Sequence, residues 1–455
     1  MQKNNSLWAR LRTHLEAPVD AINLSMWRAL FGAVLLWEAW RFVFGGKVYK
    51  YFLAREFWFP YPYFEFIRPL SAEWMYGIFG LFALCSACLM LGFHPRKASV
   101  GAFFTYSYVM MIDKTEYNNH YYLTGLLLLV FASVGSGRSF TWPKSRGSEL
   151  IPRWHADAFR YLIALVYFYG GIAKLNPDWL AGEPMRHWLP NTRSVRDAGL
   201  EQVFGSELSV MFFSYGGLLY DLLIGFLLIN RRLRPIGIVT SLFFHLTNNW
   251  LFSIGVFPVM MICSLVLFID AKHLRRLTRL PTPSLEGAKP YVMRPKVMFA
   301  IIAFATVQIL VPFRHWLIPG DVTWTEEGHA FSWRMKLRSK RGRVTFYVED
   351  PDTGGRHKVN EREWLDKRQV RKMKVRPHMI VQFAHFLASE LQEPGQPRPI
   401  IKVKARLSLN YRQYAVMIDP DINLANVSYN PWGHNGWITM EGAELRRKTA
   451  AAVAN

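Results

Sequence analysis

The chain has 455 residues, of which 51% are hydrophobic, 15% aromatic and only 19% charged. This composition excludes a disordered protein, and the length exceeds one ordinary soluble domain, so we expect two parts. The formal net charge of +22 fits either nucleic-acid binding or a membrane protein with basic loops. Cys85, Cys88 and Cys263 lie in apolar stretches, so we expect neither a disulfide framework nor a metal site.

Long apolar stretches recur through the first two thirds of the chain. A helix needs about 20 mainly apolar residues to cross about 30 Å of hydrocarbon. About nine stretches approach this length. They are 22–44, 73–93, 98–112, 120–135, 157–175, 208–229, 235–252, 254–270 and 297–316. We therefore predict a mainly α-helical polytopic membrane domain over residues 1–316, with the lipid bilayer as its partner.

Lysine and arginine residues accumulate in every second loop between these stretches. They are Arg10, Arg12, Arg96, Lys97, Arg138, Lys144, Arg146, Arg153, Arg231, Arg232, Arg234, Lys272, Arg275, Arg276 and Arg279. Because basic loops resist translocation, this asymmetry predicts a cytoplasmic N-terminus. The positive charge is thus explained mainly by topology, and we expect no nucleic-acid partner.

An odd number of crossings places the rest of the chain, residues 317–455, on the extracytoplasmic side. Apolar and polar residues alternate over 342–350, 399–410 and 411–419, which is typical of strands, and 377–391 is typical of a helix. We predict a β-rich α+β domain here. The basic run 367–376 is explained first as a solvated surface and second as a site for an acidic substrate.

Three polar clusters lie at the outer ends of the predicted spans, where ionisable groups cost at least about 2.5 kcal/mol and suggest function. In 118–125, His120 is either a helix-capping or interfacial residue or part of a site, and Asn118 is a candidate helix cap. In 243–260, His245 precedes a tight turn. A transporter would instead place such residues near the midplane of broken helices in repeated halves, and neither feature is evident.

Lys174 belongs to the third cluster, 167–182, and ends an apolar stretch just before Pro177. It either extends to the lipid headgroups or is buried. If it is buried, desolvation favours the neutral amine, which can act as a base near neutral pH.

Several motifs occur together in one order. They are DKTEYNNHYYLTGLL (113–127), GGIAKLNPDWLAG (170–182), LFSIGVFPVMM (251–261), GHAFSWRMKLRS (328–339) and IDPDIN (418–423). In these motifs the chain resembles the vitamin K-dependent gamma-glutamyl carboxylase family and its bacterial relatives that share the HTTM membrane domain. The resemblance covers most of the chain.

This resemblance implies an integral membrane enzyme that oxidises reduced vitamin K (phyllohydroquinone or menaquinol) with O2 to the epoxide. The strong base formed would deprotonate a glutamyl side chain of a peptide or protein, to which CO2 adds, without any metal. The resemblance assigns Lys174 as the base toward the hydroquinone and His120 to orienting it. Asn119 would hold His120, and His245 is a further candidate for the same cavity.

Binding of the glutamate carboxylate calls for an arginine fork. The resemblance favours Arg412, with Trp333 and the basic run as weaker candidates. Ala173 replaces a lysine that often precedes the base, and the extended C-terminal region of animal carboxylases is missing, which affects carboxylation more than epoxidation. An uncoupled quinol epoxidase or another quinone-dependent oxidoreductase, and a non-enzymatic transporter or sensor, remain alternatives.

Overall fold

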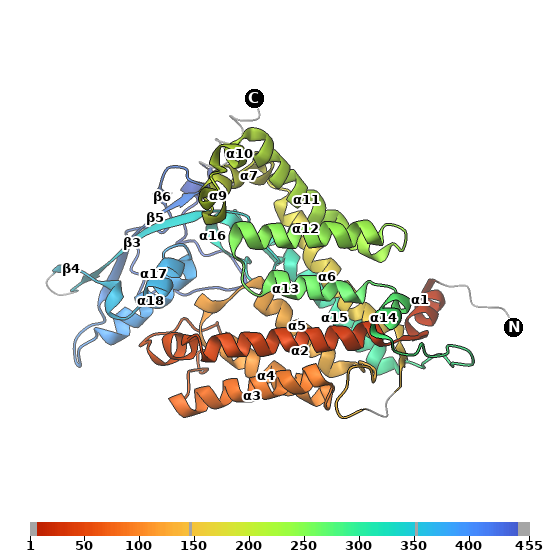
Figure 1. Cartoon of the computed structure of the whole chain (residues 1–455). Coiled ribbons are helices and arrows are strands. Elements are labelled where there is room, and N and C mark those ends of the chain that lie inside the picture. The colour runs from red at the N-terminus through yellow and green to blue at the C-terminus, as the bar shows by residue number, and fades with distance from the viewer. Residues whose placement is uncertain (1–6, 145–147, 351–353, 445–455) are drawn as a thin grey trace.

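The N-terminal part of the computed structural model, which describes residues 7–144, 148–350 and 354–444, is mainly helical (Figure 1). The long helices are α2 (Ile22–Val43), α3 (Ala72–Leu91), α4 (Pro95–Ile112), α5 (Asn119–Ser133), α6 (Arg153–Lys174), α11 (Glu207–Ile229), α12 (Arg234–Phe252) and α15 (Pro295–Phe313). Between them lie α1 (Leu7–Glu16), η1 (Tyr49–Leu53), η2 (Lys114–Glu116), α7 (Pro177–Leu180), α8 (Met185–Trp188), η3 (Leu189–Asn191), α9 (Arg193–Asp197), α10 (Glu201–Gly205), α13 (Phe257–Ser264), η4 (Leu265–Leu267) and α14 (Ala271–Thr278). A small antiparallel sheet pairs β1 (Pro18–Asp20) with β2 (Leu150–Pro152).

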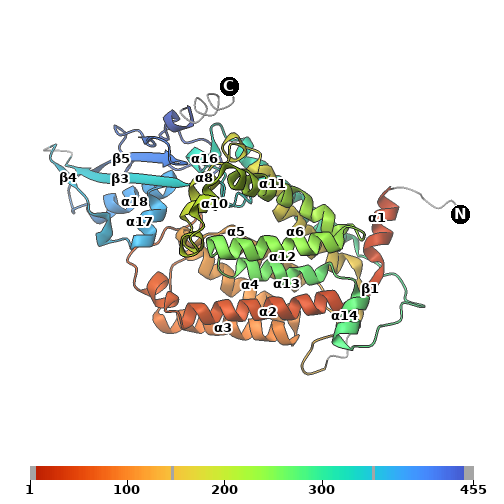
Figure 2. The same ribbon diagram turned by 45° about the horizontal axis from the view of Figure 1, so that its top comes forward.

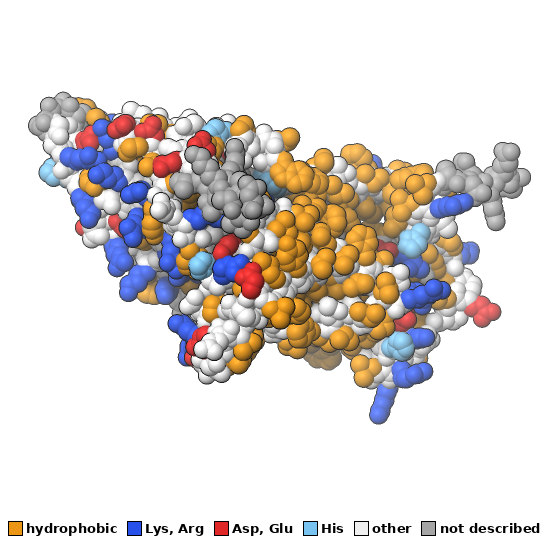
Figure 3. Space-filling model, turned by 90° about the horizontal axis from the view of Figure 1, so that it is seen from above, with side chains coloured by type: hydrophobic (Ala, Val, Ile, Leu, Met, Phe, Trp, Pro, Cys, Tyr) orange, Lys and Arg blue, Asp and Glu red, His pale blue; other side chains and the backbone are white. Residues whose placement is uncertain are grey.

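Three of the described helices are long and apolar enough to cross a membrane: α3, α11, and α15 extended through η5 (Arg314–Trp316). A fourth span results if α13–η4 and α14 count as one, although they are bent by 104°. The prediction of a mainly helical N-terminal part is confirmed, and this part contains candidate membrane spans. Figure 3 shows hydrophobic side chains gathered in the middle of the molecule, between two ends that carry many Lys and Arg side chains.

The predicted count of about nine straight spans is confirmed only in part. Each predicted stretch contains helix, but α5 has 15 residues, fewer than the roughly 20 that a perpendicular crossing needs. The eighth stretch, 254–270, is not one straight helix. The chain turns at Asp270, whose carboxylate accepts a hydrogen bond from the Arg234 guanidinium at 2.8 Å.

The C-terminal part contains a four-stranded antiparallel sheet in the order β4 (Arg356–Lys358), β3 (Lys340–Glu349), β5 (Ile400–Leu409) and β6 (Ala415–Val416). Buried side chains of β3 and β5 share a hydrophobic core with α17 (Lys367–Met373) and α18 (Pro377–Glu390), which lie on one side of the sheet (Figures 1 and 2). The short elements α16 (Val322–Thr325) and η6 (Glu361–Glu363) complete this part.

The strand predictions for 342–350 and 399–410 and the helix prediction for 377–391 are confirmed within a few residues. The predicted strand 411–419 is wrong over most of its length, because only Ala415–Val416 joins the sheet. Asn410 and Tyr411 have φ values of 49° and 63°, so the chain makes a left-handed turn that alternation of residue types does not reveal.

A buried ion cluster joins the helical part to the sheet domain. The Arg55 guanidinium donates to the carboxylates of Asp113 at 2.9 Å, Glu116 at 3.3 Å and Asp366 at 2.8 Å. Arg368 adds an ion pair to Glu116 at 2.9 Å. Because Asp366 caps the N-terminus of α17 and Asp113 caps η2, this cluster fixes α17 against the loop that precedes α5.

Candidate active site

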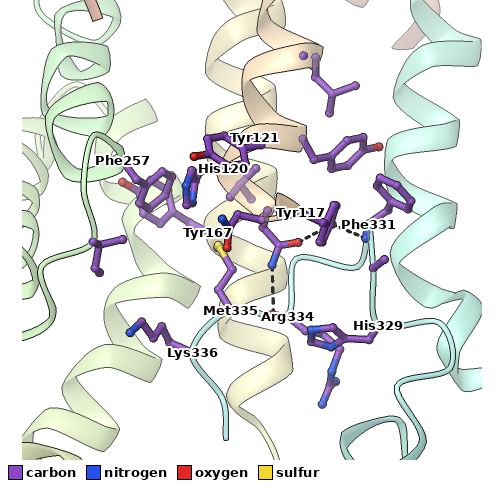
Figure 4. Close-up of a pocket in the computed structure, with 18 of the residues that line it drawn as sticks. Tyr117, His120, Tyr121, Tyr167, Phe257, His329, Phe331, Arg334, Met335 and Lys336 are labelled. Carbon is purple, nitrogen blue, oxygen red and sulfur yellow. Dashed lines mark hydrogen bonds between the residues drawn. The ribbon is translucent and has the colours of Figure 1, made fainter. Parts of the chain in front are cut away.

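A cavity of about 1020 Å³ lies between the helices and the sheet domain (Figure 4). Its walls come from α4, α5, α6, α11 and α12, and from the segment 326–336 and α17. Aromatic side chains dominate the lining, among them Phe103, Tyr106, Tyr121, Tyr122, Tyr167, Phe244, Phe257 and Phe331. Pockets of about 300–1,000 Å³ suffice for most small organic ligands, so this one has room for a two-ring ligand beside a peptide side chain.

Lys174 ends α6 at the wall of this cavity. Its Nζ donates hydrogen bonds to a carboxylate oxygen of Asp221 and to the Gly170 carbonyl at 3.3 Å, and it lies 5.3 Å from the centre of the Trp179 ring. The side chain does not extend to the headgroups, since the residue is only 7% exposed. The opposite charge of Asp221 offsets the cost of burying the amine.

Asp221 hydrogen-bonds Lys174 and was missed by the sequence analysis. The available signal was one carboxylate inside the apolar stretch 208–229. Gly170 makes the approach of Asp221 possible, because a Cβ at that position would lie 2.9 Å from the nearer carboxylate oxygen. Asp178 instead accepts hydrogen bonds from Arg412 at 2.8 Å and from Asn410 at 2.7 Å.

His120 lies in the first turn of α5 and lines the same cavity as Lys174. Its ring centre is 4.6 Å from that of Tyr121 and 5.6 Å from that of Phe257 (Figure 4). His245 also lines the cavity, and its Nε2 lies 2.6 Å from the Tyr167 hydroxyl. The structure therefore brings both predicted histidines to the cavity that contains Lys174.

Asn119 lines the cavity too, and its side chain hydrogen-bonds residues other than His120. Its amide donates to the Arg334 carbonyl at 3.2 Å and accepts a hydrogen bond from the Tyr117 hydroxyl at 3.0 Å. That hydroxyl in turn accepts a hydrogen bond from the Phe331 backbone N–H at 2.7 Å. Asn119 thus fixes the segment that forms one wall of the cavity.

The two residues predicted to contact the glutamyl substrate lie outside the cavity lining. Trp333 is fully buried and stacks on Tyr122, with ring centres 4.9 Å apart. Arg412 forms an ion pair with Asp178, so its guanidinium group already has a carboxylate partner. These positions follow from the packing of the 331–336 segment and from the left-handed turn at Asn410 and Tyr411.

Several cations line the cavity at the end near the sheet domain: Lys114, Arg314, Arg334, Lys336, Lys372 and Arg376. The lining contains two carboxylates, Asp221 and Glu326, and Glu326 already pairs with Arg338 and with Lys340 at 2.7 Å. This end of the cavity is therefore strongly cationic.

Lys114 and Lys372 are unusual among these cations. The buried Nζ of Lys114 has no hydrogen-bond partner among the described residues. Burial lowers the pKa of Lys114 to about 7 and that of Lys372 to about 7. The prediction of a solvated basic run therefore fails for Lys372 and Arg376, which reach the cavity because the Arg55 cluster holds α17 there.

Fold and site together define a membrane protein whose helical part carries a buried lysine–aspartate pair, in a cavity closed on one side by a sheet domain. The HTTM domain family matches residues 16–272, and the lumenal domain of the vitamin K-dependent gamma-carboxylase matches residues 293–444. The chain belongs to the vitamin K-dependent gamma-carboxylase family, which confirms the resemblance found in the motifs. No solved structure matches the chain.

Proposed function

We propose that the protein oxidises a reduced naphthoquinone with O2 to its epoxide and couples this oxidation to the addition of CO2 at a glutamyl side chain. The observation that carries the proposal is that Lys174, paired with Asp221, lines one aromatic cavity together with His120. Membership of the carboxylase family supports the same chemistry. We place the sheet domain on the extracytoplasmic side, in line with the distribution of basic loops.

The cavity fits a lipid-soluble quinol. Phe212 of α11 and Phe243 of α12 belong to its lining and are each 60% exposed on the outside of the bundle, where lipid would lie. A quinol can thus enter from the bilayer without crossing water, and its rings can stack on the aromatic lining. When bound, the hydroquinone reacts with O2 and supplies the strong base for the glutamyl carbon.

The residues of this chain prepare that reaction. In its neutral form, Lys174 accepts the proton of the hydroquinone hydroxyl, and Asp221 then holds the ammonium in place and balances the charge it has gained. His120, between Tyr121 and Phe257, orients the ring. The aromatic walls exclude water, which would otherwise quench a strong base.

We assign the glutamate carboxylate to the cationic end of the cavity. Lys114, Lys372 and Arg376 line it, whereas Arg412 is held by Asp178. Charge-assisted hydrogen bonds from these groups suit a carboxylate, and the Lys114 ammonium makes no other hydrogen bond among the described residues.

The direct test uses the full chain in nanodiscs with chemically reduced vitamin K and O2. Formation of the epoxide, followed by chromatography, together with incorporation of labelled CO2 into a glutamyl peptide, is the expected result. Epoxide without labelled peptide would identify an uncoupled epoxidase. Absence of epoxide with both phyllohydroquinone and menaquinol would contradict the proposal.

Replacing Lys114 tests the assignment of the carboxylate site. Lys114→Met is expected to raise the KM for a glutamyl peptide by about tenfold, the equivalent of one charge-assisted hydrogen bond of about 1.5 kcal/mol. The matched control is Lys97→Met, which removes an exposed lysine at the opposite end of α4. An equal KM for both variants would rule out Lys114 as a ligand of the carboxylate.

The two lysines at the cationic end of the cavity also lead us to expect that the KM for the glutamyl peptide depends on pH. Lys114 and Lys372 are ammonium ions below their pKa values of about 7 and lose this charge as the pH rises through them, while the glutamate stays ionised. The KM for the glutamyl peptide is therefore expected to increase between pH 6 and pH 8. Measuring the KM across this range for the natural sequence and for Lys114→Met checks the cause, because the variant should show a flatter profile.

A further inference from the structure

One face of the C-terminal sheet is packed and the other is exposed. Side chains of β3 and β5 alternate between the two faces, and the buried set includes Val344, Phe346, Val403 and Ala405. The exposed set includes four cations, Arg341, Arg343, Lys404 and Arg406, which we call the basic sheet face. Figure 3 shows Lys and Arg side chains gathered over this domain.

The pairing of the strands brings these charges together. Arg343 lies directly opposite Arg406, and Lys404 lies opposite Thr345, one pair further along the same face. Like charges directly opposite one another destabilise a sheet. The repulsion within the basic sheet face therefore lowers the stability of the folded domain. Packing of the domain core does not require cations at these positions.

Acidic side chains do not neutralise this face. Within the described part of the chain, none of the four cations forms a salt bridge. Glu349 lies at the far end of β3, and it already pairs with Lys402 at 3.0 Å and with Arg356 at 3.4 Å. The positive charge of the face is thus available to a partner.

Two tyrosines hold the arginines in position. The Arg341 guanidinium lies 4.3 Å from the centre of the Tyr411 ring, and that of Arg343 lies 4.3 Å from the centre of the Tyr414 ring. A guanidinium stacked on an aromatic ring keeps N–H groups at its edge free to donate, and it has lost much of its rotational freedom already. This arrangement suits carboxylates, which arginine binds with paired hydrogen bonds.

The position of the sheet argues against the bilayer as the partner. In Figures 1 and 2, β3 and β5 run along the general direction of the long helices and lie beyond their end. The exposed face of the sheet is therefore turned sideways, away from the apolar middle of the molecule, so a flat bilayer would meet its edge and not its surface.

We propose that the basic sheet face binds an acidic, glutamate-rich segment of the peptide or protein substrate. This inference rests on the proposed function, because a substrate with several glutamyl side chains gains from being held while each one reaches the cavity in turn. Tethering raises the local concentration of the remaining side chains without any new contact at the catalytic site.

The test measures binding alone, with no quinol and no O2. A fluorescent peptide with several glutamates is titrated with the full chain in zwitterionic nanodiscs at low salt, and fluorescence anisotropy gives the Kd. The double variant Arg343→Glu/Arg406→Glu is expected to weaken binding at least about tenfold, and added salt should weaken binding to the natural sequence. The control is Arg362→Glu/Lys367→Glu, the same charge change at two exposed residues near the start of α17, with an expected effect below about twofold.

Several results would overturn the proposal. They are an unchanged Kd in the sheet variant, an equal loss in both double variants, or equal binding of a peptide with glutamine in place of glutamate. Selective loss of binding to anionic vesicles or to RNA, with peptide binding unchanged, would assign the face to those partners. If the charge-reversal variant does not fold, Arg343→Gln/Arg406→Gln is measured in its place. An intermediate loss of peptide binding is then expected. Peptide binding without epoxide formation would reject the proposed function and keep this inference.

Discussion

Replacement of Lys174 by alanine is expected to lower the rate of hydroquinone epoxidation by about 10²- to 10⁴-fold, the range that a positioned general base contributes. The reason is that Lys174 is the amine at the cavity wall, within hydrogen-bond reach of Asp221. The measurement is epoxide formed per minute by the full chain in nanodiscs. Lys272→Ala, which changes an exposed lysine of α14, is the control and should retain the natural rate.

A second substitution separates the roles that Lys174 can have. Lys174→Arg keeps a positive charge beside Asp221, but a guanidinium does not give up its proton near neutral pH and cannot serve as the base. The arginine variant is therefore expected to be as inactive as the alanine variant. Epoxidation at the natural rate in Lys174→Arg would mean that the site needs only a cation. The double variant Lys174→Met/Asp221→Leu removes both charges. If this variant folds and Lys174→Ala does not, the unpaired Asp221 carboxylate is the cause of the folding defect.

Arg55→Met is expected to give the largest loss of stability. Arg55 and Asp113 have side chains that are 2% and 0% exposed, so the substitution leaves a buried carboxylate without its cation. Breaking a buried ion pair on one side costs about 3–5 kcal/mol. Hydrogen exchange should then increase in α17 and in the loop before α5 and less in α18. Arg68→Met, at an exposed arginine between η1 and α3, is the control.

The stability of this variant should also depend on pH in a defined direction. Burial raises the pKa of Asp113 to about 6 even with Arg55 present, and removal of the guanidinium raises it further. The folded state then binds this proton more tightly than the unfolded state, so stability is present at low pH and is lost as the pH rises through the folded pKa. Thermal unfolding of Arg55→Met should occur at a higher temperature at pH 5 than at pH 7.5, and the opposite order would contradict this account.

The sequence was sufficient to group residues that line the cavity with Lys174, because the signals for these residues are local. Lys174 and His120 each stand at the end of an apolar stretch, and His245 lies in the second half of another, toward the same predicted side of the membrane. Helices that end together bring such residues together. Asp221 was within reach of the same reasoning, since a carboxylate inside a span is costly. The predicted clusters lie at the ends of the spans, whereas Asp221 lies inside α11.

The rest of the site depends on contacts between distant segments. Lys372 reaches the cavity only because Asp366 binds Arg55, more than 300 residues earlier in the chain. Arg412 points to Asp178 because of a turn with positive φ. The segment NYRQY (410–414) contains no glycine, and Asn410 is its only residue of a type that favours this conformation. The predicted number of spans is confirmed only in part, because residue polarity alone does not distinguish a crossing helix from one that is short or bent.

The segment 331–334 closes the cavity from the sheet-domain side, through the hydrogen bonds of Phe331 to Tyr117 and of Arg334 to Asn119. Both parts of the chain thus contribute to the lining of the cavity, and the helical part contributes the larger share. A membrane fragment expressed by itself would have an open, wet chamber, and a detached sheet domain would have none. An intact cavity therefore needs both parts of the chain, and mixing separately produced parts would restore it only if they reassemble around these four residues.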